Sequence, residues 1–262
     1  MQTTKIEWTN RTWNPVTGCS KISSGCQNCY AEIMACRLRA MGQKKYRNGF
    51  DVSLHEECFT EPLKWKKPCN IFVCSMGDIF HKKVTDSFIN KIMKTIKETP
   101  HHQYQLLTKR SDRMVAYFQT NDIPRNVWLG VTVEAKEYKK RIDDLRYVKN
   151  VAVRFLSCEP LLEDLGELDL TNIDWVIVGG ESGLRGRQMC KEWVNSIKKQ
   201  CEDNRVPFFF KQWGTWGEDG IKRNKCENGK SLDKKIIQNF PNFKTQSSQS
   251  ILSKKLLSFT FK

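Results

Sequence analysis

The sequence predicts an α/β fold, a complete or partial (β/α) TIM-like barrel with about seven parallel strands. Short runs that are apolar throughout recur between Asn70 and Gly214, and such strands are buried on both faces, as in parallel sheets. Polar, helix-like segments separate most neighbouring runs, which is typical of strand–helix–strand units. Polar residues and glycines gather where the runs end. A doubly wound open sheet is the second choice, because periodicity does not determine closure.

The expected elements follow one another along the chain. A first strand is expected near Trp13 to Thr17, and a helix from Tyr30 to about Met41. Three further helices are expected over 87–98, 134–148 and 191–203, where polar and apolar residues alternate at helical spacing. The remaining strands are expected at IFVCSM (71–76), YQLLTK (104–109), VWLGVTVE (127–134), VRFLSCEP (153–160), WVIVGGES (175–182) and PFFFKQW (207–213).

Composition predicts a barrel domain over residues 1–217 and a basic, partly disordered tail over 218–262. The chain has 262 residues and a formal net charge of +15, and its segment from Ile221 to Lys262 holds ten Lys and Arg against two Asp and Glu. This tail has two interpretations, a solvated segment or an electrostatic arm for the phosphate backbone of a nucleic acid.

The chain has eleven cysteines, and their state depends on the compartment. No export signal and no apolar stretch of membrane-spanning length is evident, so we expect a cytoplasmic protein without a membrane partner. In a reducing compartment the cysteines should be free thiols, core residues or metal ligands rather than disulfides.

Charged residues and glycines follow the predicted strands at the edge where ligands bind in both fold types. We expect them to line one mouth, the carboxylates to contact ligand groups and the lysines to bind anions. The alternative is a set of carboxylates satisfied by local hydrogen bonds or paired with the lysines. The expected cofactor-binding residues are Ser75, Gly77, Asp78, Gly179, Gly180 and Glu181, and the expected catalytic residues are Lys109, Glu134, Glu159 and Lys211.

The stretch TWNPVTGCSKISSGCQNCYAE (12–32) carries Cys19, Cys26 and Cys29 in a C-x6-C-x2-C pattern directly after the first predicted strand. Structural zinc sites take four ligands, and no fourth cysteine of suitable spacing follows. Three thiolates suit a [4Fe–4S] cluster that keeps one iron open for a small molecule. The pattern favours a cluster and leaves zinc, or no metal, as alternatives.

The chain resembles a phage- and mobile-element-associated family of three-cysteine proteins of unknown function, and more broadly the radical S-adenosylmethionine (SAM) superfamily of barrels. The resemblance covers residues 5 to about 217. Its matching blocks are TWNPVTGCxxxSxGCxxCYAE, SMxDxFH (75–81), LTKR (107–110), GVTVE, RFLSCEPLL, WVIVGGESG and PFFFKQWG.

The superfamily resemblance implies that Cys19, Cys26 and Cys29 ligate a [4Fe–4S] cluster whose open iron chelates SAM. It also implies an electron donor, reductive cleavage of SAM to a 5′-deoxyadenosyl radical, and Asp78 as an acceptor for the methionine ammonium. The chain departs from the superfamily in the wider first spacing, in Asn28 before the third cysteine, and in the late position of the Gly-Gly-Glu element.

The substrate class expected from the basic charge is a nucleic acid or a nucleotide, which makes a nucleic acid modification enzyme the concrete hypothesis. Two other functions remain open from the sequence. One is a non-catalytic nucleic-acid-binding protein with a structural metal site, and the other is a cluster-bearing redox sensor.

Overall fold

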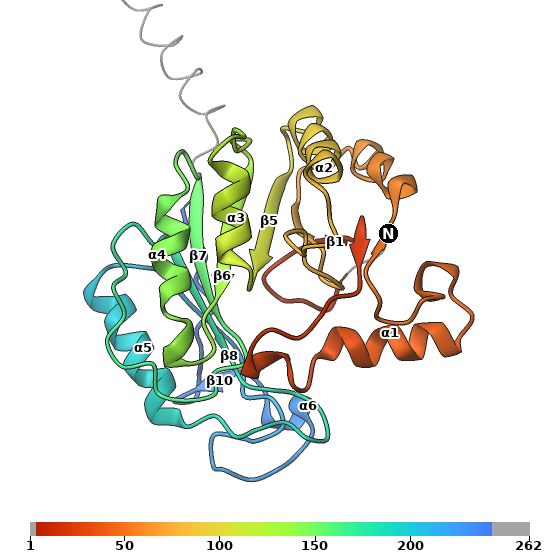
Figure 1. The fold of residues 1–262 in the computed structure, drawn as a ribbon. Coiled ribbons are helices and arrows are strands. Elements are labelled where there is room, and N and C mark those ends of the chain that lie inside the picture. The colour runs from red at the N-terminus through yellow and green to blue at the C-terminus, as the bar shows by residue number, and fades with distance from the viewer. Residues whose placement is uncertain (1–3, 243–262) are drawn as a thin grey trace, which may run out of the picture.

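The computed structural model of the protein describes residues 4–242 and contains an open, curled sheet of seven parallel strands (Figure 1). Spatial order follows chain order without reversal, β1-β4-β5-β6-β7-β8-β9. Right-handed crossovers that all proceed in one direction place their helices on one face, whereas a doubly wound sheet reverses its order. The predicted partial barrel with seven parallel strands is confirmed. The strands are β1 (Arg11–Trp13), β4 (Asn70–Val73), β5 (Gln103–Thr108), β6 (Val127–Thr132), β7 (Val153–Cys158), β8 (Trp175–Gly179) and β9 (Phe208–Gln212).

Helices α2 to α5 cover the outer face of the sheet, and Figure 1 shows α1 lying apart from them. In α2, Phe88, Ile89, Ile92 and Ile96 are buried at helical spacing, and the Thr85 side chain caps the helix by accepting a hydrogen bond from the Phe88 N–H. No helix within residues 4–242 combines the length and apolar character of a membrane span. The helices are α1 (Tyr30–Ala40), α2 (Asp86–Glu98), α3 (Ser111–Phe118), α4 (Lys140–Tyr147), α5 (Lys191–Asp203) and α6 (Lys225–Asn228).

The predicted first strand is divided in two. Only β1 joins the main sheet, and β2 (Val16–Thr17) pairs antiparallel with β3 (Ser53–Leu54). Pro15 separates the two pieces and has no N–H for the parallel ladder. The division turns the chain away from the sheet immediately before the three-cysteine stretch.

Aromatic side chains fill the inner face of the sheet. Alternate residues of each strand face inward, and Phe72, Trp128, Phe155 and Trp175 are buried there in one cluster with Phe209 and Trp8. A Cβ at Gly130 would lie 2.5 Å from the Phe155 ring, so the glycine provides the space that this ring occupies. The filled interior leaves the carboxyl edge as the part of the barrel open to a ligand.

The packed chain continues beyond the boundary predicted at residue 217. Residues 218–242 include α6 and the β10 (Ser231–Leu232) and β11 (Lys235–Ile236) pair. The Phe210 N–H donates to the Ile237 carbonyl at 2.7 Å, and Leu232 is buried in the main core. The Lys- and Asn-rich composition conceals these few apolar anchors. The rest of the predicted tail, 243–262, lies outside the described residues.

Candidate functional site

Residues 18–29 form the three-cysteine loop between β2 and α1, and its first residue is fastened to the end of β4. The Gly18 N–H donates to the Met76 carbonyl at 2.8 Å, and Gly18 pairs with Gly77 in an isolated bridge. A Cβ at Gly77 would lie 3.0 Å from the Val16 carbonyl oxygen. Gly77, predicted to bind a cofactor, is thus placed where its small size lets the loop approach the strand end.

Asp78 acts on the loop through Arg110. Its buried carboxylate accepts hydrogen bonds from the Thr108 hydroxyl at 2.8 and 2.9 Å and from Arg110 at 3.0 Å. Arg110 also donates to the Ser20 carbonyl at 2.9 Å and to the Cys19 Sγ at 3.3 Å. The buried ion pair therefore positions the guanidinium against the first cysteine.

Glu134 supports the middle of the loop from the end of β6. It is fully buried and accepts a 2.8 Å hydrogen bond from Arg141 and a second from the Ser23 hydroxyl. A Cβ at Gly25 would lie 2.8 Å from the Glu134 Oε1, so the loop backbone rests directly on this carboxylate. The Ser24 N–H donates to the Tyr138 hydroxyl at 3.0 Å.

Glu181 supports the far end of the loop from the turn after β8. Its carboxylate accepts from the Arg187 Nε at 2.8 Å and from the Asn28 side chain at 3.0 Å. Burial alone would raise the pKa of Glu181, but the hydrogen bonds from Arg187 and Asn28 outweigh burial, and the pKa is lowered. Arg187 also donates to the Ser24 carbonyl at 3.0 Å.

The first two glycines of the GGESG turn, Gly179 and Gly180, lie close to neighbouring parts of the chain. A Cβ at Gly180 would lie 1.9 Å from the Trp213 carbonyl oxygen, a distance that no real Cβ tolerates. A Cβ at Gly179 would approach the Glu159 Oε2 at 3.2 Å. Both glycines were predicted to bind a cofactor. Gly180 allows the turn to pack against the chain after β9, and Gly179 leaves room for the Glu159 and Lys211 side chains.

Ser75 joins the end of β4 to α1. Its hydroxyl donates to the Asn14 Oδ1 at 3.2 Å, and its carbonyl accepts from the Tyr30 hydroxyl. Tyr30 is the first residue of α1 and follows Cys29 directly. The predicted cofactor-binding serine therefore helps to place the end of the loop.

Within the described residues, the side chains of Lys109, Glu159 and Lys211 make no hydrogen bond to the loop backbone. The Lys211 Nζ lies 2.6 Å from the Glu159 Oε2, in a partly buried ion pair that joins the ends of β7 and β9. Lys109 is half-buried, and its ammonium has no hydrogen-bond or ion-pair partner within residues 4–242. In strand register Lys109 continues the inward side of β5.

The three thiols differ in their surroundings, although each is partly exposed. Burial raises the pKa of Cys19, and the Asp78 charge raises it further. Burial also acts to raise the pKa of Cys26, but hydrogen bonds from Ile22 and Ser23 and the Lys109 charge outweigh burial and lower it. Among residues 4–242, no three His, Cys, Asp or Glu side chains are gathered in a geometry that would hold a metal ion.

The three cysteine thiols are chemically suitable ligands for an iron–sulfur cluster. They are soft donors on one loop, and the cations Arg110 and Lys109 lie beside two of them. Positive charge near thiolate ligands offsets the negative charge of a cluster. The site therefore has suitable ligands and a suitable electrostatic environment.

Sequence reasoning missed the residues that connect the strand ends to the loop. Arg141 and Arg187 form ion pairs with the predicted Glu134 and Glu181, and Ser23 and Asn28 of the loop donate hydrogen bonds to the same two carboxylates. The stretch GGESGLRGR shows Arg185 and Arg187, but its spacing does not indicate which of them pairs with Glu181. Cys158 is fully buried in the helix-facing core.

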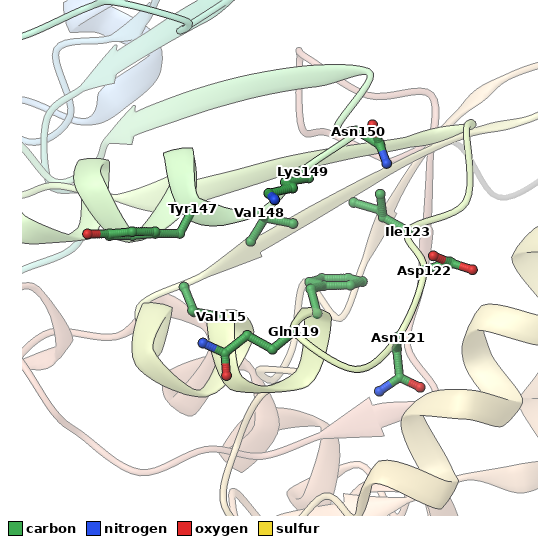
Figure 2. Close-up of a pocket in the computed structure, with 10 residues that line it drawn as sticks. Val115, Gln119, Asn121, Asp122, Ile123, Tyr147, Val148, Lys149 and Asn150 are labelled. Carbon is green, nitrogen blue, oxygen red and sulfur yellow. The ribbon is translucent and has the colours of Figure 1, made fainter.

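A separate cavity of about 350 Å³ lies between the end of α3 and the segment after α4 (Figure 2). Figure 2 shows Val115, Ile123 and Val148 beside it, with Gln119 and Asn121 on the α3 side. These segments precede β6 and β7, so the cavity is at the amino edge of the sheet. None of the predicted site residues lines it.

The protein is a partial α/β barrel with a three-cysteine loop at its carboxyl edge. The chain belongs to the family described as "Protein of unknown function (DUF5131)", whose model matches residues 3–241. No curated protein matches the chain.

Among solved structures, the chain is similar to a cysteine-to-serine mutant of spore photoproduct lyase, with 13% identity and a TM-score of 0.43, covering 99% of this chain and 78% of that one. It is also similar to the lyase complexed with dinucleoside spore photoproduct, with 12% identity and a TM-score of 0.40, covering 94% and 72%. A double mutant of the lyase with bound AdoMet and dinucleoside spore photoproduct matches with 12% identity and a TM-score of 0.40, covering 95% and 74%. Nothing about the function of this chain follows from these likenesses.

Proposed function

We propose that the protein is an iron–sulfur enzyme of the radical SAM type, in which Cys19, Cys26 and Cys29 hold a [4Fe–4S] cluster. One observation carries the proposal: a single loop with three thiols is fastened at the carboxyl edge of a partial barrel by side chains from the ends of several strands. A cluster held there by the three cysteines would pass one electron from an external donor to SAM for its reductive cleavage.

The residues of the chain divide into two groups under this proposal. Asp78, Glu134 and Glu181 hold the loop through hydrogen bonds and ion pairs. Lys109 and the Glu159–Lys211 pair are left to contact ligands. The ammonium of Lys109, at the inner edge of β5 and without a partner in the described part of the chain, is suited to bind the carboxylate of SAM.

The aromatic inner layer has a role of its own. Trp128, Phe155 and Trp175 fill the barrel beneath the carboxyl edge and keep water out of it from below. A reactive intermediate generated at this edge needs such a dry floor, because water access favours side reactions.

The proposed substrate is a nucleic acid or a nucleotide, and the proposed partner is a one-electron donor. The net charge of +15 supports an anionic substrate. The expected phage association and cytoplasmic location stay predictions.

The experiment that tests the proposal is anaerobic reconstitution with iron and sulfide, followed by iron and sulfide analysis and visible absorption. We expect a brown protein with about four irons per chain, as a [4Fe–4S] cluster requires. Cys26→Ala should lose the cluster. Cys36→Ala is the matched control, because Cys36 is an exposed cysteine on the adjoining helix.

The reduced protein is then incubated with SAM and examined for 5′-deoxyadenosine. Its formation supports the enzyme. A stable cluster that never cleaves SAM would indicate the redox sensor, and a colourless protein with one zinc ion would indicate the structural metal site.

A further inference from the structure

We propose that Glu181 and Arg187 form a latch that sets the position of the Cys26–Cys29 half of the loop, so that Arg187 is a positioning residue for cluster ligation. The inference rests on the proposed function for its link to a cluster. Its structural part stands on hydrogen bonds within the chain.

The contacts of the latch lie on both sides of the two closely spaced thiols, Cys26 and Cys29. Arg187 donates to the Ser24 carbonyl at 3.0 Å, two residues before Cys26. Asn28, directly before Cys29, donates to the Glu181 carboxylate and to the Arg185 carbonyl, both at 3.0 Å. A shift of the latch therefore moves the backbone on either side of the thiol pair.

Four donors already contact the Glu181 carboxylate. Its Oε2 accepts from the Arg187 N–H at 2.9 Å, from the Arg187 Nε at 2.8 Å and from Asn28 at 3.0 Å. Its Oε1 accepts from the Arg187 Nη2 at 2.5 Å. A carboxylate offers about four acceptor sites, about two on each oxygen, so Oε2 is saturated and Oε1 keeps about one site. Most of the acceptor capacity of Glu181 therefore serves the contacts with Arg187 and Asn28.

The turn that carries the latch is rigid. The Thr215 N–H donates to the Glu181 carbonyl at 2.9 Å, and the Trp216 Nε1 donates to the Gly186 carbonyl at 2.7 Å. A Cβ at Gly186 would lie 2.6 Å from the Thr215 Oγ1. Because the chain after β9 holds this turn on both sides, Arg187 extends to the loop from a fixed base.

The other end of the loop has an independent support. Arg110 holds Ser20 and Cys19 from the end of β5, three strands away from β8 in the sheet. The separation of Cys19 from the Cys26–Cys29 pair is then set by two supports on one rigid sheet. Losing the latch should free the pair while Cys19 stays in place.

The test compares Arg187→Gln and Glu181→Gln with Arg185→Gln in the full chain. Arg185 is the matched control, because its side chain is exposed and makes no hydrogen bond or ion pair within the described residues. Hydrogen–deuterium exchange of the metal-free protein is the first measurement. Each charge-assisted hydrogen bond lost should speed local exchange about tenfold or more, so amides of residues 22–29 should exchange at least about tenfold faster in both latch variants, with β8 unchanged.

The second measurement is cluster retention after anaerobic reconstitution, followed as iron loss to a chelator and by electron paramagnetic resonance. Latch variants should lose iron about tenfold faster and show an altered resonance of the reduced cluster, and Arg187→Lys should recover part of the loss. Should the wild type hold no cluster, the exchange experiment still decides the latch.

Unchanged exchange over 22–29, or an equal rise in Arg185→Gln, overturns the proposal. Where Arg187→Gln fails to fold, Asn28→Ala removes the latch contact from the loop side and gives the same comparison.

Discussion

Replacing Glu134 by glutamine removes the charge that compensates Arg141 in a fully buried setting. Glu134 has no exposed surface, and the Arg141 side chain is only 8% exposed. Removing one member of a buried pair costs about 3–5 kcal/mol, because the other charge is left uncompensated. Arg141 keeps a 2.7 Å hydrogen bond to the Thr132 carbonyl and lies 4.2 Å from the centre of the Tyr138 ring. The lower end, about 3 kcal/mol, is therefore expected.

Urea denaturation of the metal-free protein measures this loss. Glu32→Gln is the control, because Glu32 forms a comparable 3.0 Å ion pair with Lys21 on the surface of α1. Exposed pairs contribute about 0–1 kcal/mol. A Glu134→Gln protein as stable as Glu32→Gln would refute the reasoning, since the buried carboxylate would then hold nothing in place.

Three further outcomes are expected. Lys109→Ala should weaken SAM binding to the reconstituted protein about tenfold by calorimetry, whereas the exposed Lys82→Ala should not; equal affinities would remove Lys109 from the ligand site. Gly180→Ala should lower the free energy of unfolding by at least about 3 kcal/mol, and Gly179→Ala, whose Cβ meets only flexible side chains, should cost less; the reverse order would contradict the packing account. Iodoacetamide should label the exposed cysteines of α1 and α6 in the folded protein and spare Cys158, whose burial raises its pKa well above the ordinary value; rapid labelling of Cys158 would show that the core opens.

Most of the fold was predictable, because strands buried on both faces appear in the sequence as continuous apolar runs. The apolar runs and the helical segment 191–203 coincide closely with β4 to β9 and α5. The single first strand was wrong because the Asn14–Pro15 step ends the ladder, a local effect that an apolar pattern does not show. The folded residues 218–242 escaped prediction because their contacts, such as Gln238 bridging to β9, depend on a partner distant in sequence.

The location of the candidate site was predictable from the sequence, but the roles of its individual residues were less so. Their position after predicted strands placed Asp78, Glu134 and Glu181 at one edge of the sheet, and in the structure they follow β4, β6 and β8. Which of them face a ligand depends on pairing with Arg110, Arg141 and Arg187, and those partners come from other turns and helices. Sequence spacing carries no information on such pairs.

Some strand-end charges are paired with arginines and others are not, and this difference limits where a ligand can bind. Three carboxylates are filled by arginines that also serve the loop or its supports, so they offer little to a second partner. Below the edge, the aromatic layer around Trp175 occupies the interior. What remains is the rim between Lys109 and the Glu159–Lys211 pair, on the inner side of β5, β7 and β9. A ligand held there meets the Glu159–Lys211 ion pair and the ammonium of Lys109, which has no ion-pair partner among residues 4–242. Anionic groups are therefore favoured over cationic ones at this rim.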